Sequence, residues 1–295
     1  MGRAVLGVVG GSGLYELPEL RKPEWRPVVT PWGEPSDELL FGTLHGLDVI
    51  FLPRHGRRHC VPPSGINYRA NIDALKRAGA TDLVSFSACG SLREELAPGN
   101  FVIADQFIDR TFAREKSFFG TGCVAHVAFG HPVSPLLADL AAAAAGRVGA
   151  VVHRGGTYLA MEGPQFSTLA ESRLYRAWGC DVIGMTNMPE AKLAREAELP
   201  YATVAMVTDY DSWHDDHGAV DVSKIIATMH GNAETARQTL SALAESFPRE
   251  HPPCPIGSDH ALDVAIITPA GERDPELMKR LDAVAGRVLA AERAR

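Results

Sequence analysis

The sequence lacks the features that mark secreted, zinc-binding or membrane-spanning chains. Its 295 residues include five cysteines, an odd number, widely spread and without a CxxC pair, so neither a disulfide framework nor a structural zinc site is expected. The longest apolar run, LADLAAAAAG, is too short and too weakly hydrophobic to span a bilayer. The N-terminal MGRAVLGVVGG has no signal-peptide pattern. We therefore expect a soluble, cytoplasmic protein.

Positive charge is scarce as well. The chain carries 29 Lys and Arg against 36 Asp and Glu, for a formal net charge of −7. This balance argues against nucleic acid or an anionic membrane as the main partner. Hydrophobic residues at 45% and charged residues at 22% are ordinary for a globular protein, and the length is sufficient for a large core.

Apolar segments of strand length alternate with segments of helical periodicity, which predicts an α/β fold. Strands are expected at residues 4–9, 39–44, 49–53, 82–86, 101–104, 156–161, 182–185 and 201–207. The second and third of these flank His45-Gly46 and predict a hairpin. Helices are expected at 66–78, 135–145, 167–178 (opened by Ser167), from Pro189 onward, and at 222–247.

The C-terminal part breaks this alternation. REHPPCPIGSDH, residues 249–260, has the composition of a linker, and apolar residues at helical spacing follow at 277–289. We expect one domain over residues 1–250. Residues 251–295 would then form a linker and a final amphipathic helix that packs on the body or on a neighbouring subunit.

One predicted buried strand is followed by two aspartate residues. Residues 204–207 are apolar, and Asp209 and Asp211 follow shortly after in TDYDSW. Aspartate is common in turns, so ordinary loop chemistry is one interpretation. The carboxyl ends of strands in open α/β sheets are also where ligands bind, and the choice depends on what other strand ends supply.

Other strand ends present groups suited to an anion. GVVGGSGLY places Gly10, Gly11, Ser12 and Gly13 after the first strand, which predicts either a phosphate-binding turn or an ordinary glycine turn. It is not a dinucleotide motif, because Glu16 stands where the last glycine of GxGxxG would fall, and no Walker lysine follows.

LPRHGRRH places Arg54 and His55 directly after another strand, where arginine offers a fork that matches phosphate; a solvated basic loop is the alternative. SFSACGSL and IGMTNMPE add small hydroxyl residues, among them Thr186, at two further strand ends. Together these segments predict a phosphate site beside an acidic site.

These segments also resemble a known family. GGSGLY, TPWGEPSD, RHGRRH, NYRANIDAL, SACGSLREEL, DQFIDRT, EGPQFST, GMTNMPEA and TDYDSW occur in order between residue 4 and about residue 247. They are similar to motifs of the 5′-methylthioadenosine phosphorylases, in the trimeric branch of the purine nucleoside phosphorylases. The resemblance implies a central mixed β-sheet flanked by helices and a homotrimer. It also implies phosphorolysis of methylthioadenosine to adenine and 5-methylthioribose 1-phosphate, with phosphate as co-substrate and neither metal nor organic cofactor.

The resemblance assigns roles to individual residues. Phosphate would be held by Ser12, Arg54, His55, Ser87, the backbone of Ala88, and Thr186. The nucleoside would contact Met185 at the ribose and Phe166, Ser167, Asp209 and Asp211 at the base. The 5′ substituent would contact Val222, Ile225 and Ile226, with His126 supplied by the adjoining subunit.

In this reaction the two aspartates, Asp209 and Asp211, would face the purine base. A protonated Asp209 would donate to purine N7, and this requires a raised pKa, which burial and the charge of Asp211 favour. The acids also suit the 6-amino group of adenine. A 6-oxopurine nucleoside phosphorylase, a nucleoside hydrolase and a non-catalytic nucleotide-binding protein remain as alternatives.

Overall fold

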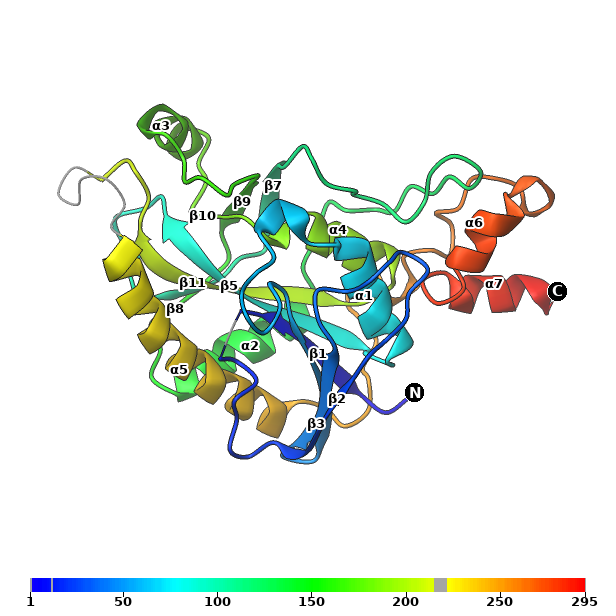
Figure 1. The fold of residues 1–295 in the computed structure, drawn as a ribbon, viewed down its shortest axis with the longest axis horizontal. Coiled ribbons are helices and arrows are strands. Elements are labelled where there is room, and N and C mark those ends of the chain that lie inside the picture. Colours follow the sequence, from blue (N-terminus) through cyan, green and yellow to red (C-terminus); the bar gives the residue numbers. More distant parts are fainter. Residues whose placement is uncertain (1, 12, 215–221, 295) are drawn as a thin grey trace.

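The structure, a computed structural model, describes residues 2–11, 13–214 and 222–294. Within these ranges eleven strands form one mixed sheet at the centre of the molecule (Figure 1). The strands are β1 Val5–Gly10, β2 Arg21–Arg26, β3 Leu39–Leu44, β4 Leu47–Pro53, β5 Asp82–Ser91, β6 Phe101–Ile103, β7 Gln106–Arg110, β8 Val152–Arg154, β9 Thr157–Met161, β10 Val182–Gly184 and β11 Tyr201–Tyr210. The expected α/β class with a central mixed sheet is confirmed.

The pairing of the central strands decides where polar side chains can meet. β1 lies between β4 and β5 and is parallel to both, and β5 is also parallel to β11. β10 pairs antiparallel with the last residues of β5 and parallel with β9. The carboxyl ends of β1, β4, β5 and β11 therefore lie at one edge of the sheet.

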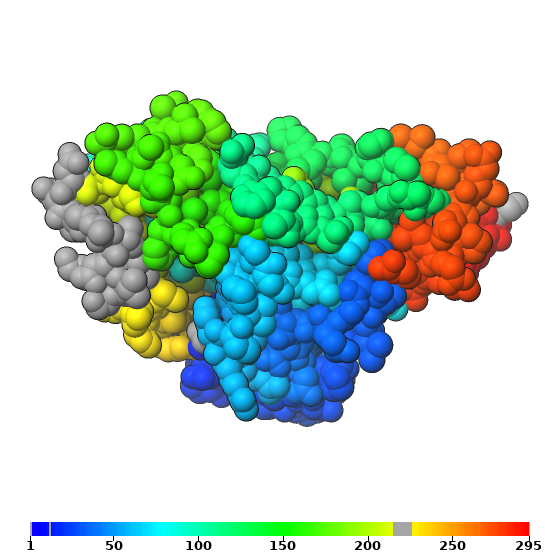
Figure 2. All heavy atoms as spheres, turned by 45° about the horizontal axis from the view of Figure 1, so that its top comes forward, coloured from blue at the N-terminus to red at the C-terminus, as the bar shows by residue number. Residues whose placement is uncertain are grey.

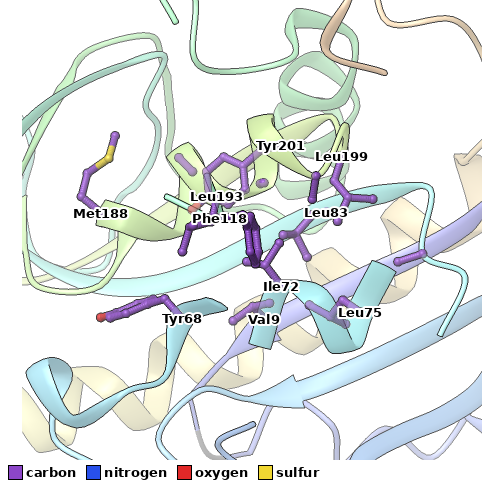
Figure 3. Close-up of a cluster of buried hydrophobic side chains, with 14 of the residues drawn as sticks. Val9, Tyr68, Ile72, Leu75, Leu83, Phe118, Met188, Leu193, Leu199 and Tyr201 are labelled. Carbon is purple, nitrogen blue, oxygen red and sulfur yellow. The ribbon is translucent and has the colours of Figure 1, made fainter. Parts of the chain in front are cut away.

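Helices cover both faces of this sheet. They are α1 Tyr68–Arg77, α2 Pro135–Arg147, α3 Leu169–Ala177, α4 Asn187–Glu196, α5 Val222–Ser246, α6 Pro275–Arg280 and α7 Gly286–Arg293, with short 3₁₀ turns at Pro63–Gly65, Ser258–His260 and Ala270–Glu272. α1 and α4 share one hydrophobic core with the sheet, and α2 and α5 share another. Figure 3 shows the first core, where Ile72 and Leu75 of α1 lie close to Leu83 of β5. No helix within the described ranges is both long and apolar enough to cross a membrane.

Several element predictions hold and others need correction. The 39–44 and 49–53 hairpin is confirmed as β3 and β4. The strand expected at 82–86 runs on to Ser91. β2, β7 and β8 were not expected, because their sequences are polar or very short. The expectation that Ser167 opens a helix is wrong: Thr168 is the N-cap of α3 and forms a capping box with Glu171.

The C-terminal segment packs on the body of its own chain. The single helix expected at 277–289 is instead two short helices, α6 and α7, separated by a turn. Leu281, Val284 and Leu289 are buried in the core shared with α1 and α4. Asp282 accepts hydrogen bonds from Arg77 of α1. In Figures 1 and 2 this orange and red segment lies at the opposite end of the molecule from the start of α5.

Leu281→Ala tests whether this packing holds the C-terminal segment in place. The substitution removes a side chain that is 0% exposed and leaves a cavity. We expect the free energy of unfolding to fall by about 2–5 kcal/mol, measured by urea denaturation. Val264→Ala, at a residue 96% exposed, is the matched control and should change it by less than about 0.5 kcal/mol. Equal stability of the two variants would show that the segment does not belong to the cooperative core.

Candidate active site

A cavity of about 590 Å³ opens where the strand ends meet. Its walls include Arg54 after β4, Ser87 and Ala88 within β5, Met185 and Thr186 after β10, and Asp209 and Asp211 at the end of β11. Sequence positions more than 150 residues apart thus share one wall, because the parallel register of β1, β4, β5 and β11 aligns their ends. The volume is within the range of small-molecule sites.

One end of the cavity gathers hydrogen-bond donors. Arg54 is 2% exposed, and its Nε donates to Glu190 Oε2 at 2.8 Å. Ser87 Oγ lies 3.3 Å from Thr186 Oγ1 and 3.1 Å from Tyr158 Oη. Burial disfavours the charge of Arg54, but Glu190 outweighs that effect and keeps its pKa above the usual value. Charged and hydroxyl donors at this spacing suit a tetrahedral oxyanion.

His55 is neutral at this end. Burial and, second, the adjacent charge of Arg54 lower its pKa to about 4. Its Nδ1 lies 2.8 Å from the carbonyl oxygen of Val61. A carbonyl only accepts, so Nδ1 carries the hydrogen and Nε2 is left as an acceptor. His55 therefore does not add a second positive charge beside Arg54.

The other end of the cavity is acidic. Asp209 lies near the end of β11, after a register shift between Val207 and Asp209, and Asp211 lies one residue beyond the strand. Both line the cavity. Ser167 Oγ donates to Asp211 Oδ2 at 2.5 Å and so fixes the position of this side chain. Burial first, and then the charge of Asp211, raise the pKa of Asp209 to about 6. The pair therefore offers one carboxyl that carries a proton more readily than usual.

The wall between the two ends is held by an ionic junction that the sequence did not reveal. Arg114 Nη1 donates to the carbonyl oxygens of Met185 at 2.5 Å and Met188 at 2.7 Å. Glu162 accepts from Arg114 Nε at 3.2 Å, from the backbone N–H of Phe112 at 2.6 Å, and from Ser64. Burial opposes the charge of Glu162, but these bonds outweigh it and lower its pKa to about 2.

The remaining predicted residues are placed as follows. Phe166 lines the cavity, whereas Ser167 lies buried behind Asp211. Ser12 lies outside the described residues, as do the side chains of Val222 and Ile225. Ile226 is half exposed, and the described residues of α5 that line the cavity are Met229, Asn232 and Ala233.

His126 is not on this cavity. It is exposed and lines a separate hollow with Val127 and Phe129. The backbone N–H of His126 donates to Ala265, and that of Ile267 donates to Val124, so the C-terminal segment pairs with this stretch. In its own chain, His126 is therefore not brought together with the other predicted residues.

Sequence reasoning missed several residues in or behind the cavity wall, among them Glu190, Arg114 and Met229. Glu190 lies in the first turn of a helix, where an acidic residue is common without any further role. Arg114 lies in a segment with no periodic pattern. Met229 had a usable signal, since it stands at helical spacing from Val222 and Ile225.

Comparison with known proteins agrees with this architecture. The sequence profile described as the phosphorylase superfamily matches residues 5–247. The chain is 63% identical over 287 residues to S-methyl-5′-thioadenosine phosphorylase from Cereibacter sphaeroides, an alignment that covers 97% of this chain and 99% of that protein.

Solved structures give the same result. A crystal structure of methylthioadenosine phosphorylase from an antarctic soil metagenomic library has a TM-score of 0.88 at 43% identity, covering 96% of this chain and 99% of that one. Methylthioadenosine phosphorylase from Schistosoma mansoni in complex with adenine has a TM-score of 0.77 at 36% identity, covering 82% and 91%.

A carboxyl with a raised pKa makes stability depend on pH. Below pH 3.8 Asp209 is protonated in both the folded and the unfolded chain. Between pH 3.8 and about pH 6 only the folded chain keeps this proton. The free energy of unfolding therefore falls as the pH rises through this interval. Asp209→Asn does not titrate. Its stability relative to the wild type should therefore increase by about 1–3 kcal/mol from pH 4 to pH 8 in urea denaturation. A constant difference would contradict the raised pKa.

Proposed function

This chain belongs to the phosphorylase superfamily and, within it, to the S-methyl-5′-thioadenosine phosphorylases, and we propose that it cleaves 5′-methylthioadenosine with phosphate. The products are adenine and 5-methylthioribose 1-phosphate. The observation that carries the proposal is the division of one cavity into a donor end at Arg54, Ser87 and Thr186 and an acidic end at Asp209. A nucleoside whose base lies at the acidic end presents its ribose toward the donor end.

Asp209 serves as the acid. Breaking the bond between C1′ and N9 leaves the electron pair on the purine and positive charge on the ribose. Protonated Asp209 transfers its proton to N7, and a phosphate oxygen forms the new bond to C1′. The resulting carboxylate regains a proton from water. With a pKa of about 6, about a tenth of the free enzyme carries this proton at pH 7.

Phosphate binds at the donor end. Arg54, Ser87, Thr186 and the backbone of Ala88 supply donors, with Ser12 assigned from the family resemblance alone. Neutral His55 presents Nε2 as an acceptor, which suits the protonated oxygen of a hydrogen phosphate. Phosphate is the co-substrate, and we propose that the reaction uses no metal or organic cofactor.

The acid pair favours adenine as the base. Asp211 is held in place by Ser167, and a carboxylate there matches the 6-amino donor of adenine and opposes the oxygen of a 6-oxopurine. The adenine complex of the Schistosoma mansoni protein is in keeping with this choice. Met229 and Ala233 of α5 line the cavity and are apolar, as a 5′-methylthio group requires; Val222, Ile225 and Ile226 would extend this surface.

We propose that the working unit is a cytoplasmic homotrimer in which His126 enters the site of the adjoining subunit. His126 is exposed and lies off its own cavity. Phe112 is 82% exposed and Ile267 is 62% exposed. Phe112 precedes His126 in the same segment, and Ile267 belongs to the C-terminal stretch that pairs with it. Apolar side chains this exposed are consistent with contact between subunits.

The first test is base release from methylthioadenosine, inosine and adenosine, each with and without phosphate, followed by ultraviolet absorbance. We expect rapid adenine release from methylthioadenosine that requires phosphate. Asp209→Asn should lower kcat/KM by roughly 10²–10⁴-fold, because general acid assistance is lost. Preference for inosine would contradict the assignment of the acid pair, and release without phosphate would identify a hydrolase.

The shared site can be tested by complementation. His126→Ala should lower kcat/KM for methylthioadenosine roughly tenfold, the effect of losing one substrate contact. The His126→Ala trimer is then dissociated and reassembled together with the Asp209→Asn variant. Activity should rise, because in mixed trimers some sites combine an intact Asp209 from one chain with an intact His126 from the next. Reassembly of Asp209→Asn with Arg54→Ala is the control and should restore none, because both defects lie in the same chain's part of the site. Absence of complementation in the first mixture would contradict the shared site.

A further inference from the structure

The guanidinium of Arg54 is held from behind by a carboxylate that does not reach the cavity. Glu190 Oε2 accepts from Arg54 Nε at 2.8 Å and Oε1 accepts from Nη2 at 3.2 Å, so the contact is a two-bond fork. The side chains are 2% and 3% exposed. Glu190 is not among the residues that line the cavity, whereas Arg54 is. A planar fork of this kind fixes the orientation of the guanidinium as well as its position.

Glu190 is itself fixed by a second row of buried groups. Tyr201 Oη donates to Glu190 Oε1 at 2.9 Å. Asn187 Nδ2 donates to Tyr201 Oη at 2.8 Å and to Thr203 Oγ1 at 2.6 Å. These residues belong to α4 and β11, so the orientation of Glu190 is set by the packing of that helix against the central sheet.

This arrangement leaves one edge of Arg54 for a ligand. Of the five N–H groups of an arginine, the one on Nε and one on Nη2 go to Glu190, and the other on Nη2 goes to Ser85. Among the residues that the structure describes, Nη1 has a single hydrogen bond, a long one of 3.3 Å to the carbonyl oxygen of Phe86. Nη1 is therefore the atom of Arg54 best able to donate to an anion in the cavity.

Because of the contact between Glu190 and Arg54, this end of the cavity does not attract anions by net positive charge. Glu190 balances the charge of Arg54, and the neighbouring His55 is neutral. Ser87 and Thr186 are uncharged. Anion binding at this end must then depend on the direction of individual hydrogen bonds. A carboxylate that only balanced charge would weaken anion binding, whereas one that directs Nη1 would strengthen it.

We propose that Glu190 is a positioning residue for phosphate, which orients Arg54 so that Nη1 points at the co-substrate. The inference rests on the proposed function, since it takes phosphate as the ligand of Arg54. It makes a prediction of definite sign: removing the negative charge of Glu190 impairs phosphate binding, although the site then carries more positive charge.

The experiment compares two variants with a matched control. Glu190→Gln removes the charge, and Glu190→Asp keeps the charge but shortens the side chain by one methylene. Glu198→Gln makes the same chemical change at another buried carboxylate, just beyond the same helix, that pairs with Arg287. We measure KM for phosphate and for methylthioadenosine. Thermal unfolding with and without phosphate reports phosphate binding independently of turnover.

We expect both Glu190 variants to raise KM for phosphate by roughly tenfold or more, the effect of losing a hydrogen bond to a charged group. KM for methylthioadenosine should stay within about twofold of the wild type, and the rise in Tm produced by phosphate should shrink. Glu198→Gln should lower Tm without changing KM for phosphate beyond about twofold. A loss of folding stability alone would affect all three variants alike.

Three results would overturn the inference. A lower KM for phosphate in Glu190→Gln would show that Glu190 acts through charge alone. Wild-type behaviour of Glu190→Asp would show that its reach is unimportant. Equal changes in Glu198→Gln would assign the effect to stability. If the wild type itself shows neither phosphate-dependent turnover nor a phosphate-induced rise in Tm, the proposed function fails as well, and the two failures are thus distinguishable.

Discussion

The parallel alignment of β1, β4, β5 and β11 is the constraint on which the site depends. Their shared direction places Arg54, Ser87 and Asp209 within one cavity although they lie far apart in the sequence. The apolar cores on both faces hold this alignment, because a strand covered on both sides cannot shift its register without exposing buried side chains. The hydrophobic effect thus acts on the chemistry indirectly, by fixing the strand ends.

Burial has opposite consequences at the two ends of the cavity. At the acidic end it is the main cause of the raised pKa of Asp209. At the donor end the same low polarity would make an isolated arginine costly, and the forked contact with Glu190 offsets that cost. The cavity therefore combines a carboxyl that can hold a proton with a cation whose charge is already balanced. Such a site distinguishes ligands by the direction of its hydrogen bonds more than by its overall field.

The sequence was most informative where a polar or charged residue follows an apolar run. Arg54, Thr186 and Asp209 could be predicted because an apolar run ends just before each of them. Glu190 could not, since an acid in the first turn of a helix is ordinary, and only tertiary packing reveals that it faces Arg54.

Element boundaries failed where two residues compete for one role. Ser167 and Thr168 are both able to cap α3, and the hydroxyl of Ser167 bonds instead to Asp211, a partner distant in sequence. The C-terminal periodicity was real, but it spans two short helices, because the pattern reports which residues are buried and not whether the backbone between them turns.

The junction at Glu162 has an evolutionary consequence. It joins the start of the segment leading to His126, the turn before α1 that carries Ser64, and, through Arg114, the backbone of Met185. Phe112 and Met185 take part through their backbone, so the junction depends on the side chains of Glu162 and Arg114. Loss of either side chain leaves the other charge, or a backbone group, without its partner. The segment that leads to His126 and the backbone at Met185 are therefore held together by one pair of side chains, and Glu162 and Arg114 should change only in concert.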